Sequence, residues 1–212
     1  MYLFSRRARL TVGHARDAME WAIGQTEVAK RISGLEISLF SQVFSPQVGT
    51  MAWSAFVPDL VTLEAAGDKL NADDGFVSAA DRGAAFITGG FDDTLAEVVH
   101  GAPDPARRVE YATTVRAVCR NGGVARGMEV GVEIAQRAER VTGTPTLFLA
   151  ETTSSYGAVG WVTGFDDVAA MEKAQHALNA DASFIEFVDR EAGDVYVEDS
   201  SITTQLIFRR LA

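Results

Sequence analysis

The chain has 212 residues, 47% of them hydrophobic, which is enough to bury one large core or two small ones. Its formal net charge of −10 repels phosphate backbones and anionic bilayers, so we expect neither nucleic acid nor a membrane among its partners. No apolar run is long enough to cross a bilayer, and the single cysteine, Cys119, permits no intrachain disulfide. These features predict a cytoplasmic protein.

The first half of the sequence predicts the order strand, helix, strand, strand, helix, strand. Alternating apolar residues indicate the strands, and alanines on one face indicate the first helix. The expected strands are 3–12, 35–44, 50–57 and 93–100, and the first expected helix is 14–33. A second helical region follows Asp59, a residue type that commonly caps a helix N-terminus.

The second half predicts the same order again. The expected strands are 108–119, 146–153, 158–165 and 202–210, and the first expected helix is 123–142. Asp166 is the expected N-cap of the second helical region. Gly34 and Gly143 follow the two long helices, where glycine commonly ends a helix.

A repeated heptapeptide supports the duplication. The chain reads "KLNADDGF" at 69–76 and "ALNADASF" at 177–184, an offset of 108 residues that also places Trp53 on Trp161. In the upstream helices the offset is 109 residues and places Arg31 on Arg140. We therefore expect two tandem units, 1–104 and 105–212, joined near "GAPDPARR".

The element order is that of the ferredoxin-like βαββαβ motif. Two such units predict an α+β fold, a fused pseudo-twofold α+β barrel. Within the heptapeptide, Asn71 and Asn179 are expected to end one helix in the left-handed conformation. Asp73 and Asp181 are expected to cap the next helix, so the motif is interpreted as a joint between helices rather than as a catalytic site.

Two segments of about thirty residues carry a family resemblance. They are "MAWSAFVPDLVTLEAAGDKLNADDGFVSAAD" (51–81) and "VGWVTGFDDVAAMEKAQHALNADASFIEFVD" (159–189). Each has a strand tryptophan, an acidic helix start and Leu-x-x-Asp before an aromatic residue, and so resembles NIPSNAP-type segments of the dimeric α+β barrel superfamily. The resemblance implies small-molecule-binding proteins, cofactor-independent oxygenases or isomerases that take apolar or aromatic compounds.

Three aromatic residues are candidate ligand contacts. Trp53 and Trp161 occupy equivalent strand positions, where packing between helix and sheet is favoured over lining an apolar cavity. Tyr111 is a candidate hydrogen-bond donor to a ligand. For Cys119, packing as a small hydrophobe is favoured over a reactive thiol.

Two histidines are candidate ligand contacts, and the resemblance also implies haem proteins that use a histidine near the second helix. His176 lies in that region, about 140° from Met171 and about 160° from Leu178 around the helix, so exposure to solvent is favoured. His100 ends a strand and is expected to face the barrel or its rim. No histidine or cysteine pair has metal-ligand spacing, so no metal site is expected.

Three functions remain open at this point. The favoured one is binding of a small apolar or aromatic molecule without a cofactor, with or without oxygenase or isomerase activity. The second is haem binding or haem degradation, and the third is a non-catalytic interaction or scaffold protein. Pairing of sheet edges or helices between copies leaves a homo-oligomer open as well.

Overall fold

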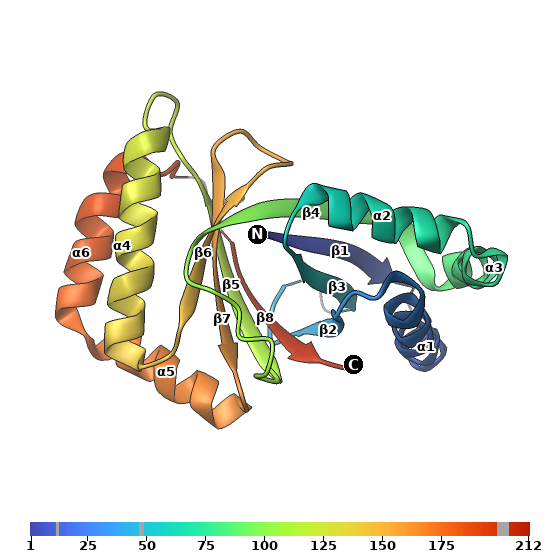
Figure 1. Cartoon of the computed structure of the whole chain (residues 1–212). Helices are drawn as coiled ribbons and strands as arrows, with labels where there is room; N and C mark the ends of the chain where they lie inside the picture. Colours follow the sequence, from blue (N-terminus) through green and yellow to red (C-terminus); the bar gives the residue numbers. More distant parts are fainter. Residues whose placement is uncertain (12, 47–48, 199–203) are drawn as a thin grey trace. The chain divides into compact units, whose positions relative to one another are not determined.

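The computed structural model describes the chain except for residues 12, 47–48 and 199–203 (Figure 1). The expected strand over 202–210 therefore lies partly outside the described residues. Within these limits the chain divides into two compact units. Unit 1 comprises 1–95 and 209–212, and unit 2 comprises 96–208. The two tandem units that the sequence repeat suggests, 1–104 and 105–212, stay a prediction.

The first seven elements follow the predicted order closely. They are β1 (Tyr2–Leu10), α1 (Ala15–Ser33), β2 (Ile37–Val43), β3 (Thr50–Val57), α2 (Leu60–Asn71), α3 (Asp74–Gly83) and, after a short 3-10 turn at Ala84–Phe86, β4 (Ile87–His100). Helix α1 contacts both α2 and α3. It ends at Gly34 with φ of 77°, a left-handed conformation that glycine adopts without a steric cost.

The remaining elements repeat that order. They are β5 (Tyr111–Val118), α4 (Val124–Thr142), β6 (Thr146–Glu151), β7 (Ala158–Phe165), α5 (Val168–Ala180), α6 (Ala182–Val195) and β8 (Thr204–Arg210). Helix α4 contacts both α5 and α6, and Figure 1 shows α4 beside α6. The eight strands close in the order β1-β3-β2-β8-β5-β7-β6-β4, which confirms the predicted α+β barrel.

Strand register places one large side chain beside each strand tryptophan. Leu39 on β2 pairs with Trp53 on β3, and Phe148 on β6 pairs with Trp161 on β7. Residues opposite each other in an antiparallel pair point to the same face of the sheet. Both pairs therefore lie on the sheet face against which the unit's own helices pack.

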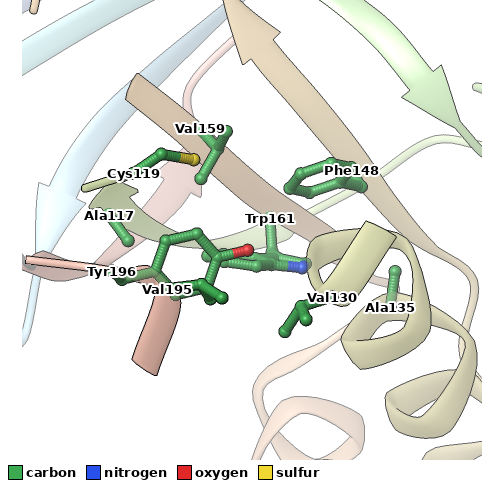
Figure 2. Close-up of a cluster of buried hydrophobic side chains, with 9 residues drawn as sticks. All are labelled: Ala117, Cys119, Val130, Ala135, Phe148, Val159, Trp161, Val195 and Tyr196. Carbon is green, nitrogen blue, oxygen red and sulfur yellow. The ribbon is translucent and has the colours of Figure 1, made fainter. Parts of the chain in front are cut away.

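The core of unit 2 surrounds Trp161 (Figure 2). The Phe148 ring lies 5.3 Å from the indole between ring centroids, and the Tyr196 ring meets it edge-on at 5.7 Å. Phe148 is fully buried against α4, where Gly131 leaves room for the ring. Figure 2 shows the indole nitrogen of Trp161 turned toward α4.

In the core of unit 1, residues of other sizes lie at the equivalent contact between helix and sheet. At the 109-residue offset, Gly131 corresponds to Ala22 and Phe148 corresponds to Leu39. Ala22 and Leu39 are both fully buried in one hydrophobic cluster. A larger helix residue therefore faces a smaller strand residue in unit 1, which keeps the helix close to the sheet in both units.

The helix joints form as the aspartates predict. Asp73 accepts a hydrogen bond from the Phe76 backbone N–H at 2.7 Å, and Asp181 accepts one from the Phe184 N–H at 2.8 Å. Asp59 caps α2 as expected. In unit 2, however, the N-cap of α5 is Asp167, so the prediction of Asp166 was wrong by one residue.

The conformation predicted for the two asparagines is also wrong. Asn71 is the last residue of α2, and Asn179 lies within α5. Neither has a positive φ. The chain instead turns at the capping aspartates, where Asp73 has φ of −95° and ψ of 102°. An N-cap residue takes such an extended conformation, so no left-handed residue is needed at the joint.

Candidate functional site

The two strand tryptophans pack between helix and sheet, which was the favoured interpretation. The Trp53 Nε1–H donates to Thr26 Oγ1 at 2.9 Å, and the Trp161 Nε1–H donates to the Gly131 carbonyl at 2.8 Å. Each indole N–H therefore already has a protein acceptor. The Trp53 ring also meets Trp21 and Phe91 edge-on, each at 6.2 Å between centroids.

The histidines lie apart from these rings. His176 is exposed on α5, as its helical position predicts. His100 is half-buried at the end of β4, where its Nε2 lies 3.8 Å from Glu139 Oε2. That distance is too long for a hydrogen bond, and Nε2 forms none within the described residues.

Tyr111 begins β5 and packs against the cluster of Phe165 and Met171. Within the described part of the chain, no hydrogen bond, ion pair or ring contact joins any two of Trp53, Trp161, Tyr111, His100 and His176. None of the five lines either of the two hollows described next. Their ligand-binding role stays a prediction.

A hollow lies among the three helices of unit 2, and we call it the helical groove. Its volume is about 590 Å³. It is lined by Arg137, Arg140 and Val141 of α4, Ala177 and Ala180 of α5, Asp181 at the joint, and Ser183 and Phe184 of α6. The helix joint therefore forms one wall of the groove.

Two guanidinium groups enter the groove from α4. Arg137 donates through Nε and Nη2 to Glu133 Oε1, at 3.1 and 2.8 Å. Its guanidinium carbon also lies 3.9 Å from the centre of the Phe187 ring, a cation–π contact. Arg140, one helical turn later, is exposed and pairs with no carboxylate of the described residues.

One carboxylate lies at the opposite wall. Asp181 accepts from the Ser183 hydroxyl at 2.6 Å and from the Phe184 N–H. These hydrogen bonds, the serine hydroxyl first, lower the pKa of Asp181 below its ordinary value. Neither Arg137 nor Arg140 forms an ion pair with Asp181, so the two charge types stay separate within the described residues.

A second hollow, the threonine cavity, lies between the sheet and the opposite sides of α4 and α5. Its volume is only about 40 Å³. Thr113, Thr142, Thr146, Thr163 and Gln175 line it together with Ala138, Phe165, Met171, Ala174 and Leu178. The Thr146 and Thr163 hydroxyls lie 2.9 Å apart and hydrogen bond to each other. A cavity this small is filled by few or no solvent molecules and leaves no room for an organic ligand.

Haem does not fit these two hollows. The threonine cavity is far below the roughly 300–1,000 Å³ of a typical organic-ligand pocket. The helical groove is large enough, but no histidine, cysteine, methionine or tyrosine that could be an axial ligand lines it. No group of three or more metal-ligating side chains occurs elsewhere in the described residues.

The barrel and its two ferredoxin-like halves define the chain as a protein with the dimeric α+β barrel fold. A protein from Fusobacterium nucleatum named "Putative monooxygenase" matches with a TM-score of 0.72 and 7% identity, over 100% of this chain and 92% of that one. An anthrone oxidase-like protein matches with a TM-score of 0.65 and 11% identity, over 100% and 91%. A heme-binding protein from Thermus thermophilus matches with a TM-score of 0.56 and 11% identity, over 100% and 91%.

These similarities confirm the expected fold, and at such identities they show the fold alone. A NIPSNAP domain protein from Burkholderia xenovorans covers 49% of the chain with a TM-score of 0.44. No protein-family model and no curated protein matches the sequence. Among the described residues, no helix has both the length and the apolar character needed to span a membrane.

Proposed function

We propose that the chain is a small-molecule-binding protein and that its ligand occupies the helical groove of unit 2. The volume of the groove, about 590 Å³, carries the proposal because it falls within the range of organic-ligand pockets, and the groove is open to solvent with more polar than apolar exposed surface. Its lining supplies both requirements of such a site. Val141, Ala177 and Phe184 offer apolar surface, and Arg140 offers an uncommitted charge that can orient a ligand.

The proposal replaces the predicted contacts with another set of residues. Trp53 and Trp161 have their N–H groups committed to the protein, so they are poor anchors for a polar ligand. The preference for an aromatic compound is retained for the part of the ligand that lies against Phe184 and the alanines, which form the apolar part of the groove wall. No cofactor is required for binding there.

The test is a fragment screen followed by two-dimensional amide NMR of the full chain. We expect fragments to shift the amide signals of residues 177–184 before those of unit 1. Ala180→Trp should abolish these shifts, since Ala180 is exposed and lines the groove. Ala72→Trp is the matched control, because exposed Ala72 is the counterpart of Ala180 at the 108-residue offset.

The outcomes separate the open functions. A screen in which no fragment shifts the groove signals contradicts the proposal and favours the alternative of an interaction or scaffold protein. Hits that survive Ala180→Trp place binding elsewhere and also contradict it. For any ligand that binds, new product signals after incubation in air would extend the proposal to a cofactor-independent oxygenase or isomerase.

A further inference from the structure

We infer that the ligand of the helical groove is an aromatic carboxylate, with its carboxylate bound by Arg140 and its ring against Phe184. This inference rests on the proposed function and names the ligand class of that same site. It begins from the charge in the groove, where two guanidinium groups face a single carboxylate. An anion is an unusual partner for a chain with a formal net charge of −10, so its recognition requires local cations.

Arg140 supplies the uncommitted cation. Other arginines of unit 2 pair with carboxylates, as Arg126 does with Glu191 at 2.7 Å and Arg116 with Glu151 at 2.7 Å. Arg140 has no such partner within the described residues, although it lines the helical groove. A guanidinium presents a planar set of donors that matches a carboxylate in two parallel hydrogen bonds.

Arg137 supports this edge of the groove as a positioning residue. Its Nε and Nη2 donate to Glu133, and its guanidinium lies on the Phe187 ring. These contacts fix the side chain, so it needs little further ordering when a ligand binds. The Nη1 amino group has no acceptor within the described residues and can donate to a bound carboxylate.

The opposite wall determines how the ligand lies. The Phe184 ring and the small side chains of Ala177 and Ala180 leave room for a flat apolar group. Asp181 keeps its negative charge, because its hydrogen bonds lower its pKa, and therefore repels an anion. A ligand with a ring at one end and a carboxylate at the other satisfies both walls in one orientation.

Comparison of the two repeats shows which groove residues are particular to unit 2. The capping aspartate and the aromatic residue of the joint are the same in both units, as Asp73 and Phe76 show. At the corresponding offsets, however, Arg137 is replaced by Val28 and Ala177 by Lys69. Arg140 and Phe184 have counterparts in Arg31 and Phe76, so the features particular to unit 2 are Arg137 and the small side chain of Ala177.

The experiment compares three probes of similar shape by amide NMR titration: benzoate, benzyl alcohol and benzylamine. We expect benzoate to bind most tightly, with an affinity that falls as the salt concentration rises. Arg140→Gln should weaken benzoate binding by about fivefold, the scale of an exposed charge pair, and leave benzyl alcohol unchanged. Arg31→Gln is the matched control, since Arg31 is the exposed counterpart of Arg140 in unit 1.

The possible results are distinct. Equal binding of benzoate and benzyl alcohol at the groove overturns the aromatic carboxylate but leaves the proposed small-molecule site standing. Preference for benzylamine also overturns it and assigns recognition to Asp181. If fragments bind the groove but benzoate does not, the aromatic carboxylate is overturned and the small-molecule site stands. If no fragment binds the groove, the site itself is contradicted. Equal loss of benzoate affinity in Arg140→Gln and Arg31→Gln would show that the loss follows from the change in net charge, and would overturn the role of Arg140.

Discussion

Replacing Gly131 with alanine tests whether the close approach of α4 to the sheet depends on glycine. A Cβ atom built at Gly131 would lie 2.1 Å from Phe148 Cζ and 2.3 Å from its Cε2. Side-chain atoms do not approach a Cβ atom this closely, so the ring or the helix must move. Phe148 is fully buried beside Trp161, and a close-packed core leaves little space for that movement.

Two opposing effects determine the magnitude. Adding a methyl group to a packed core commonly costs about 1–3 kcal/mol, and the short contact here favours the upper end. Alanine stabilises a helix interior relative to glycine by about 1 kcal/mol. We therefore expect Gly131→Ala to lower the free energy of unfolding by about 2 kcal/mol, or the Tm by about 4–8 °C for a chain of this length.

The other repeat suggests a compensating change. Unit 1 places Ala22 and Leu39 where unit 2 has Gly131 and Phe148. We expect Phe148→Leu alone to cost about 1–2 kcal/mol through the space that it leaves. The double variant should be more stable than the two single losses predict, with a favourable coupling energy of about 1 kcal/mol or more.

The assay is denaturant unfolding followed by circular dichroism, with the slope compared among variants. Gly24→Ala is the control for helix propensity, because a Cβ atom at Gly24 in α1 would meet nothing within 4 Å. We expect this variant to be more stable by about 0.5–1 kcal/mol. A Gly131→Ala variant as stable as Gly24→Ala, or a double variant with purely additive losses, would refute the packing argument.

Three further predictions concern other buried or capping groups. Trp53→Phe should lower the free energy of unfolding by about 1–2 kcal/mol, measured in denaturant, because the hydrogen bond to Thr26 is lost. Cys119 should react slowly with a thiol reagent until the chain is unfolded, because burial raises the pKa of its thiol. The lowered pKa of Asp181 means that its carboxylate stabilises the fold above its ordinary value of 3.8 and that this stabilisation is lost as the pH falls through the lowered pKa. Asp181→Asn should therefore show a smaller loss of stability between neutral and acidic pH, and an unchanged loss would contradict the capping role.

Sequence patterns predicted the fold well because its signals are local. Alternating residues identified the strands, and the repeated heptapeptide identified the two halves. The N-cap at Asp73 was predictable because an aspartate three residues before Phe76 can reach its backbone N–H. Asp166 and Asp167 are adjacent and chemically identical, but the 108-residue offset places Asp59 on Asp167, so the repeat held the signal that the prediction of Asp166 did not use.

The candidate site was not predictable by the same means. The groove combines residues 137–141, 177–181 and 183–184, and only the packing of α4 against α5 and α6 brings them together. Attention to rare residue types led instead to tryptophan and histidine. The useful signal was a difference between the repeats, Ala177 for Lys69, next to a capping aspartate and an aromatic residue that both repeats keep.

The differences between the two repeats are of two kinds, and they have different physical meanings. One kind is a paired change, as between Gly131 with Phe148 and Ala22 with Leu39. In such a pair one residue is larger where its neighbour is smaller. Such changes preserve a core and need no function to explain them. The change from Lys69 to Ala177 removes a long charged side chain beside the joint. The two lining residues that are larger than their counterparts, Arg137 for Val28 and Ser183 for Gly75, are held by Glu133 and Asp181. An unfilled hollow costs contacts between atoms, so packing alone does not favour it, whereas a ligand that occupies the groove would restore those contacts.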